Sequence, residues 1–210
     1  HNIGPVAFAN LVARFGSASA ALKEIPRMAE RGGAKNFVLP PEGDVEREIE
    51  GLEKLGGRLI AACEEDFPPG LAALAPTPPL ISVIGNIHLL QKNMIALVGA
   101  RNASALARKF AQILSRDLGE AGLVIASGLA RGIDSAAHEA GLEHGTVAVV
   151  AGGVDIIYPP ENEALYRAIT RQGAVISEMP LGEAPQARHF PRRNRLISGF
   201  SRGVLVVEAT

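Results

Sequence analysis

The chain contains 210 residues, of which 47% are hydrophobic and 20% are charged, and its formal net charge is −1. This composition can bury a core of ordinary size and predicts one large and one small domain. The near-zero charge excludes recognition of nucleic acid through overall basicity, so any such site must be a local patch.

Residues 1–40 are predicted to form a small helical domain that begins upstream of His1. Apolar residues separated by glycine, serine and proline indicate short helices over 6–15, 18–24 and 26–32. The segment is SAM-like or resembles the second half of a helix-hairpin-helix motif, in which a glycine turn offers backbone amides to phosphate. The alternative is a small helical packing module that does not touch DNA.

Residues 41–93 are predicted to form a connector packed on the main domain. Within 44–55, apolar residues recur at helical spacing, and Gly56-Gly57 ends the helix. Residues 58–62 could form a strand. The segment 66–86 carries five prolines, which favour extended or turn structure.

Residues 94–210 alternate between short apolar runs and amphipathic segments. Helices are predicted over 106–118, 135–144 and 161–171, and strands over 94–98, 123–126, 146–150, 174–177 and 204–208. Such an alternation predicts an α/β fold with a Rossmann-like parallel sheet covered by helices on both faces. Because the last predicted strand ends close to Thr210, we expect this domain to continue beyond that residue.

In an open parallel sheet, ligands bind beyond the carboxyl ends of the strands. Four segments follow the predicted strands there: 99–104, 127–134, 152–162 and 178–195. They supply glycines for close backbone approach, hydroxyls for phosphate oxygens and a forked guanidinium. One such loop is ordinary turn chemistry, but agreement among four predicts an anion site. The candidate residues are Gly99, Arg101, Ser104, Ser127, Gly128 and Gly132.

The fourth segment carries charge of one sign. No acidic residue occurs from Ala184 to Val207, whereas the same stretch contains Arg188, His189, Arg192, Arg193, Arg195 and Arg202. This pattern indicates a polyanion at the ligand edge, with Arg192, Arg193 and Arg195 as contacts. Alternatively, Arg193 and Arg195 pair with Glu178, Asp134 or Asp155 inside the fold. Tyr158 and Phe190 could stack on unpaired bases or could belong to the core.

Several classes of function are disfavoured. The longest apolar stretches fall short of the roughly 20 residues that a membrane span needs, and the start resembles no secretion signal, so we expect a cytoplasmic protein. The single cysteine, Cys63, excludes an internal disulfide and a cysteine-based zinc site.

Neither the dinucleotide fingerprint nor the P-loop pattern is present in the sequence. We predict no metal, no cofactor and no enzymatic activity. Asp134, Asp155, Glu178 and His138 show no recognisable nucleophile and base spacing.

The ordered motifs of residues 94–210 closely resemble the DNA-processing protein A (DprA/Smf) family. They are Gly99-x-Arg101-x-x-Ser104, Ser127-Gly128-x-Ala130-x-Gly132-Ile133-Asp134, Gly153-x-Asp155-x-x-Tyr158-Pro159-x-x-Asn162, Gly173-Ala174-x-x-Ser177-Glu178 and Phe190-Pro191-x-Arg193-Asn194-Arg195. The N-terminal region and the proline-rich connector match the family more loosely.

The resemblance implies a protein that binds and protects single-stranded DNA and loads RecA recombinase during natural transformation. It also implies a homodimer and a phosphate pocket formed by the first two loops, with Arg101 and Ser104 inside and Gly128 framing it. Two departures predict altered phosphate contact: Ala100 replaces a frequent serine or threonine, and Pro160 replaces a frequent lysine. Arg188 or Arg192 could compensate.

Two other functions remain as alternatives. A phosphoribohydrolase of the cytokinin-activating type would use similar glycine-rich loops, with Glu178 and Arg193 as the catalytic pair, but its P-G-G-x-G-T-x-x-E signature is missing. A sensor of small nucleotides would bind a mononucleotide tightly, without dependence on length.

Overall fold

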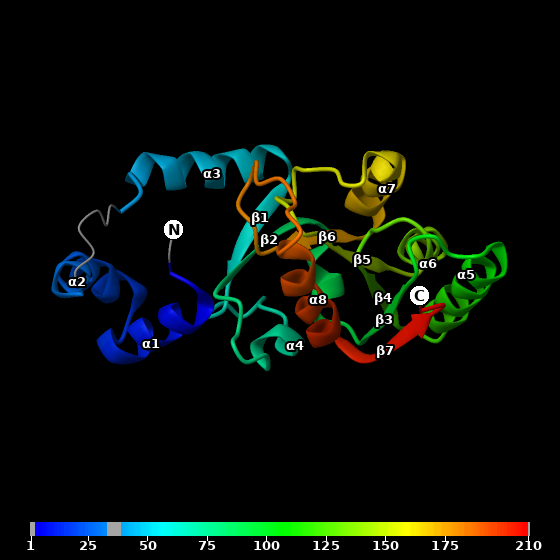
Figure 1. The fold of residues 1–210 in the computed structure, drawn as a ribbon, viewed down its shortest axis with the longest axis horizontal. Coiled ribbons are helices and arrows are strands. Elements are labelled where there is room, and N and C mark those ends of the chain that lie inside the picture. Colours follow the sequence, from blue (N-terminus) through cyan, green and yellow to red (C-terminus); the bar gives the residue numbers. More distant parts are fainter. Residues whose placement is uncertain (1–2, 33–38, 210) are drawn as a thin grey trace.

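The computed structural model describes residues 3–32 and 39–209 (Figure 1). The helices are α1 (Pro5–Phe15), α2 (Ala18–Arg31), α3 (Glu42–Lys54), α4 (Pro69–Ala72), α5 (Ala105–Glu120), α6 (Ile133–Gly141), α7 (Glu163–Gln172) and α8 (His189–Phe200). The strands are β1 (Gly57–Ala61), β2 (Leu80–Gly85), β3 (Met94–Gly99), β4 (Val124–Ser127), β5 (Thr146–Val149), β6 (Ala174–Ser177) and β7 (Ser201–Val207). Two short 3-10 turns, Ile87–Gln91 and Pro160–Asn162, complete the described elements.

The seven strands form one sheet in the order β1-β2-β6-β5-β4-β3-β7. Strands β3 to β7 run parallel, whereas β2 pairs antiparallel with β6 and with β1. The predicted α/β class is therefore confirmed, with two added features. The sheet is mixed, and it already begins at Gly57, upstream of the predicted start at Met94.

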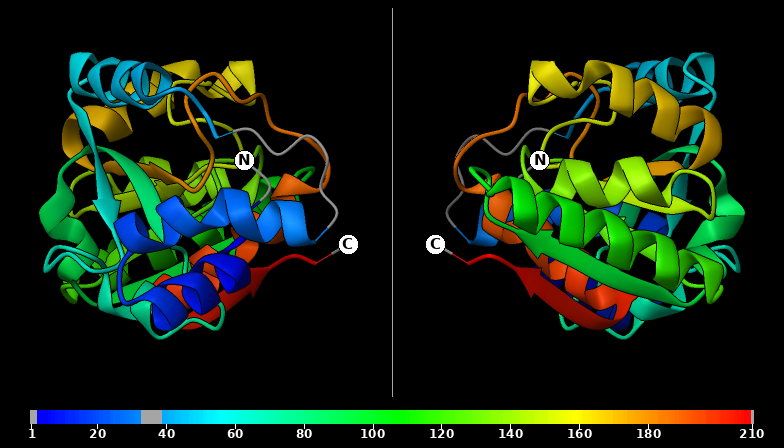
Figure 2. Two further views of the ribbon diagram at one scale, coloured as in Figure 1. Left: turned by 90° about the vertical axis from the view of Figure 1, so that its left-hand side faces the viewer. Right: turned by 90° about the vertical axis from the view of Figure 1, so that its right-hand side faces the viewer.

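The helices cover both faces of the sheet, as predicted. Helices α5, α6 and α7 lie on one face and α8 lies on the other, where it contacts α4 (Figure 2). The α8 face buries Leu196, Ile197 and Phe200 in an apolar cluster with strand residues such as Val147. The opposite face is filled by two clusters beneath α3, α7, α5 and α6. A sheet buried on both faces explains why its central strands read as continuous apolar runs.

The N-terminal region contains two helices, and the predicted break at Pro26 is wrong. Helix α1 ends at Gly16, whose φ of 81° places it in the left-handed region, and the Ser17 hydroxyl caps α2 by accepting from the Ala20 amide at 3.1 Å. Helix α2 then continues through Pro26 to Arg31. Because Ile25 is buried on its packed face, tertiary packing opposes the helix-breaking tendency of the proline.

Helix α8 occupies a stretch that was predicted as a loop. Pro191 lies in its first turn, where a missing N–H removes no helical hydrogen bond. The buried positions are His189, Arg193, Leu196, Ile197 and Phe200, which follow helical spacing. Because some of these buried positions are polar, the spacing of apolar residues alone does not reveal the helix.

A buried histidine lies between α6 and the sheet. Thr146 Oγ1 donates to Ile125 O at 2.9 Å and lies 2.7 Å from His138 Nδ1, so the ring donates from Nδ1. Its Nε2 is buried without a hydrogen-bond partner. Burial, with Arg193 nearby, lowers the pKa of His138 to about 3.

Folding stability should therefore fall as the pH drops below about 6.5, where the unfolded chain protonates His138 and the folded chain does not. The contribution of this residue should decline by about 1.4 kcal/mol per pH unit down to the folded pKa. Urea unfolding of the protein and of His138→Asn at pH 7 and pH 5 isolates the effect. The gap between the two free energies of unfolding should shrink at pH 5, and a constant gap would contradict this assignment.

Candidate nucleic-acid interface

The carboxyl ends of the five parallel strands lie at one edge of the sheet and open into a hollow of about 250 Å³. Its walls come from the segments that follow β3, β4, β5 and β6. The lining residues include Arg101, Gly128, Arg131, Gly152, Tyr158, Pro160, Phe190 and Arg193. The structure thus brings Arg101 and Arg193 to the same hollow, as the sequence predicted.

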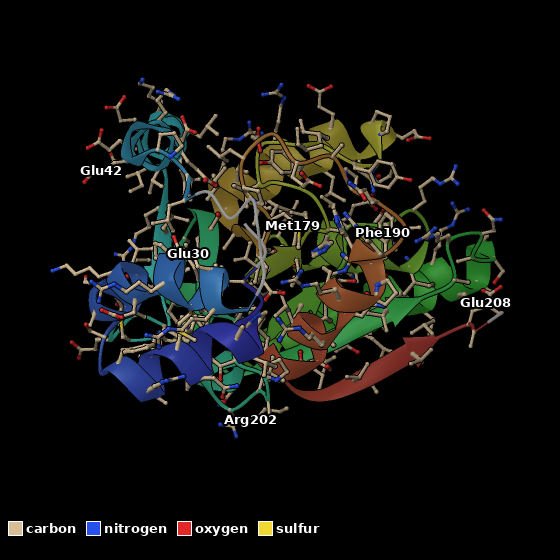
Figure 3. The ribbon with its side chains drawn as sticks, turned by 60° about the vertical axis from the view of Figure 1, so that its left-hand side comes forward. Glu30, Glu42, Met179, Phe190, Arg202 and Glu208 are labelled. Atoms are coloured by element: carbon tan, nitrogen blue, oxygen red, sulfur yellow. The ribbon has the colours of Figure 1, made fainter. Side chains whose placement is uncertain are left out.

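An exposed arginine and two aromatic rings line this hollow. The Arg101 guanidinium carbon lies 5.3 Å from the centre of the Phe190 ring, within the range of a cation–π contact. The Tyr158 ring lies 5.8 Å from Phe190 at an interplanar angle of 50°, and it is 47% exposed. Phe190 itself projects from the first turn of α8 (Figure 3). Positive charge and accessible ring surface therefore lie side by side.

Arg101 lies at the junction of three hollows. Besides the first, it lines a second hollow of about 250 Å³ with Phe190, Asn194 and Val204, and a groove between α5 and α6. It is exposed, and the structure gives it no ion pair in the described part of the chain. Its fork of donors is therefore available to a ligand.

Arg193 is buried and has a structural role. Its Nη1 donates to the carbonyl oxygens of Gly128 and Val149, at the ends of β4 and β5. Burial raises the pKa of the nearby Asp134 carboxyl, while the Arg193 charge opposes that rise. A Cβ on Gly128 would lie 2.4 Å from Arg193 Nη1, so this glycine makes room for the guanidinium. The prediction of Arg193 as a free phosphate contact is corrected: it lines the hollow, but its guanidinium joins the ends of β4 and β5.

Arg195 pairs with Glu178, as the alternative interpretation allowed. The prediction of Arg195 as a phosphate contact is therefore also corrected. Arg195 Nη2 donates to Glu178 Oε1, and its Nη1 donates to Pro76 O at 2.9 Å, which joins α8 to the connector. Burial raises the pKa of Glu178, whereas Arg195 and then Arg192 favour its ionised form. Arg192 is about half exposed, with its Nε 3.8 Å from Glu178 Oε2. Of the three predicted arginines in α8, Arg192 retains the most freedom to reach a ligand.

Glu178 does not line the main hollow, and its side chain is only 5% exposed. It lies in a narrow space with Arg193, His189 and Met179. A catalytic pair of Glu178 and Arg193 would need both groups to face the substrate. This geometry does not favour the phosphoribohydrolase alternative.

The hydroxyl groups predicted for phosphate binding are engaged elsewhere. Ser127 is fully buried and donates to Leu97 O at 2.5 Å, which contradicts its assignment as a phosphate ligand. Ser104 caps α5 by accepting from the Ala107 amide, and it donates to Glu208 Oε2 at 2.8 Å. Ser104 is exposed, but a ligand would have to displace Glu208 to receive its proton.

Two of the predicted glycines allow the loops to pack closely. A Cβ on Gly99 would lie 1.9 Å from Val207 O. Gly132 has a φ of 81°, and a Cβ there would lie 2.2 Å from Ala100 O. Both glycines thus bring segments of the ligand edge together, and Arg101 and Arg131 project from that assembly.

Arg131 lies within the second segment, 127–134, and was not among the predicted site residues. It lines both the main hollow and the groove between α5 and α6. Its exposed pair with Glu161, at 3.7 Å, is of the kind that contributes little. The signal for it was its place between Ala130 and Gly132 in the loop that follows a parallel strand.

Two further features are absent from the part of the chain that the structure describes. No helix within 3–32 and 39–209 has the length and apolar character needed to cross a membrane. Over the same residues, histidine, cysteine and acidic side chains form no cluster able to hold a metal ion.

The chain is similar to known proteins along nearly its whole length. Residues 58–210 match the family model of DNA recombination-mediator protein A, and residues 1–51 match that of the DprA-like N-terminal HHH domain. The chain is 40% identical to Protein Smf of Escherichia coli over 179 residues, covering 84% of this chain and 48% of that protein. It is 42% identical to DNA processing protein DprA of Streptococcus pneumoniae over 148 residues, covering 70% and 52%. The chain spans about half the length of these curated relatives.

Two solved structures are also similar. The X-ray structure of DNA processing protein A from Streptococcus pneumoniae superposes with a TM-score of 0.75 at 28% identity, covering 100% of this chain and 80% of that one. DNA processing protein A from Helicobacter pylori, whose structure was described for its single-stranded DNA binding mode, gives a TM-score of 0.66 at 28% identity, with coverages of 71% and 72%.

Proposed function

Since the chain belongs to the DprA/Smf family of DNA recombination mediators, we propose that it binds single-stranded DNA at the rim formed by Arg101, Arg131, Tyr158 and Phe190. The observation that carries this proposal is the exposed Arg101 guanidinium over the half-buried Phe190 ring, with the exposed Tyr158 ring beside it. A phosphate can accept from the guanidinium while neighbouring bases stack on the rings. The binding mode described for the Helicobacter pylori relative supports the same ligand class.

The preference for a single strand follows from the shape of the rim. Stacking requires a base with an accessible face, which a duplex does not offer within its stack. The hollow of about 250 Å³ is of a size to receive a splayed base rather than a stacked base pair. We therefore expect phosphate contacts to supply affinity and the rings to supply discrimination against duplex DNA.

We further propose the finer role that the family resemblance implies. In this role the protein protects incoming DNA, acts as a homodimer and delivers the strand to RecA recombinase in the cytoplasm during natural transformation. Enzymatic activity and a cofactor form no part of the proposal. Light scattering on the protein with and without RecA and an oligonucleotide tests the assembly, and monomers that never join RecA would contradict it.

Fluorescence anisotropy with single-stranded and duplex oligonucleotides across a salt series tests DNA binding. Single strands should bind more tightly, and the logarithm of affinity should fall linearly with the logarithm of salt, with a slope of about −0.7 per phosphate contacted. Tight binding of a mononucleotide without dependence on length would favour a nucleotide sensor. Release of free base from nucleoside monophosphates would favour the phosphoribohydrolase.

A further inference from the structure

A basic groove of about 660 Å³ runs between α5 and α6 beside the rim. It is larger than either neighbouring hollow, each of about 250 Å³. Four cationic residues line it, whereas Glu139 is the acidic residue in its lining. The cations are Arg101, Arg108, Lys109 and Arg131.

The cations of the groove are available for binding. Arg108 and Lys109 are exposed on α5, and no ion pair involves them in the part of the chain that the structure describes. Glu139 instead accepts a hydrogen bond from Gln112 at 3.4 Å. A groove with an excess of positive charge, in which Arg101, Arg108 and Lys109 have no ion pair among the described residues, attracts and concentrates a polyanion.

The groove is continuous with the proposed DNA-binding rim. Arg101 and Arg131 line both, so they form a shared wall between the aromatic rings and α5. The groove lining contains amide side chains, such as Asn102 and Gln112, and no aromatic ring. Such a surface suits a sugar–phosphate backbone without base stacking.

We propose that the groove between α5 and α6 is a second subsite for the same single strand, holding the backbone of nucleotides that extend past the rim. This inference rests on the proposed function and adds to it a path for the strand beyond the rim and a longer footprint. The rim holds a short segment through stacking and phosphate contact, whereas the groove holds the continuing segment through Arg108 and Lys109. Binding in the groove is consequently independent of base sequence.

The test compares Arg108→Ala/Lys109→Ala with the control Arg116→Ala/Arg171→Ala. Both variants lose two positive charges, and the control positions are exposed residues outside the groove lining. Binding is measured by anisotropy with oligothymidylates of about 4 and about 16 nucleotides, which bracket common single-strand site sizes. Thermal unfolding checks that both variants remain folded.

The groove variant should bind the long oligonucleotide about tenfold more weakly, with a salt slope shallower by about 1.4, which corresponds to two phosphates. Its affinity for the short oligonucleotide should match that of the unchanged protein, and the control should match it for both lengths. Equal losses in the two double variants, or an unchanged affinity for the long oligonucleotide, would overturn the groove subsite.

Failure of the groove subsite and failure of the proposed DNA binding give different results in this experiment. If the groove variant binds normally while Arg101→Ala loses the short oligonucleotide, only the groove proposal fails. If the unchanged protein binds neither length, both proposals fail.

Discussion

Replacing Arg193 with methionine is expected to lower the free energy of unfolding by about 3 to 5 kcal/mol, the range for removing one partner of a buried charge pair. The substitution would leave the carbonyls of Gly128 and Val149 without this donor and the buried Asp134 without its neighbouring positive charge. Methionine retains much of the side-chain volume, so the loss reports the polar contacts more than a cavity. Urea unfolding followed by circular dichroism measures it.

Arg192→Met provides the matched control, because it makes the same exchange one residue earlier in α8. Arg192 is about half exposed and meets Glu178 at 3.8 Å, so its loss should change stability by no more than about 0.5 kcal/mol. Adding Asp134→Asn to Arg193→Met should recover part of the loss, since no buried carboxyl then needs a counterion. Equal stability of the two methionine variants would show that Arg193 does not fasten the strands.

Arg101→Ala is expected to weaken single-strand binding by about ten- to hundredfold at low salt. The removed group would donate charge-assisted hydrogen bonds to phosphate, each of roughly 1.5 to 3 kcal/mol, and would leave the Phe190 ring uncovered. The salt slope should become shallower by about 0.7. Anisotropy titrations at several salt concentrations measure both quantities.

Arg101 is exposed, so the same variant should unfold within about 0.5 kcal/mol of the unchanged protein. Arg101→Lys should bind with intermediate affinity, because it keeps the charge and loses the planar fork. Arg171→Ala removes an exposed charge from the last turn of α7 and should leave binding unchanged. If Arg171→Ala weakens binding as much as Arg101→Ala, the effect is one of overall charge and the rim is not the site.

Strong apolar periodicity made most of the fold predictable from the sequence. The parallel strands β3 to β6 and the helices between them lie within a few residues of their predicted ranges, because buried strands and amphipathic helices carry distinct patterns. Strand β2 was harder to recognise, since it follows a proline-rich segment. Its position beside β6 depends on long-range antiparallel pairing that local sequence does not report.

The location of the candidate site was predictable from the sequence, but the contacts of its individual residues were less so. The rule that ligands bind at the carboxyl edge located Arg101, Tyr158 and Phe190 correctly around one hollow. The rule cannot distinguish a guanidinium that faces solvent from one that is held by partners within the fold, and Arg193 and Arg195 are of the second kind. That distinction depends on which side of α8 faces the sheet. The sequence did not show this, because the buried side includes Arg193.

Photo-crosslinking tests the central claim that unpaired nucleotides contact the rim at Arg101, Tyr158 and Phe190. A single-stranded oligonucleotide carrying 5-iodouracil is irradiated with the protein, and the crosslinked residues are identified by mass spectrometry. We predict crosslinks at Phe190 or Tyr158 that Arg101→Ala diminishes. Crosslinks confined to the Gly16 turn between α1 and α2, with none at the two rings, would contradict the account.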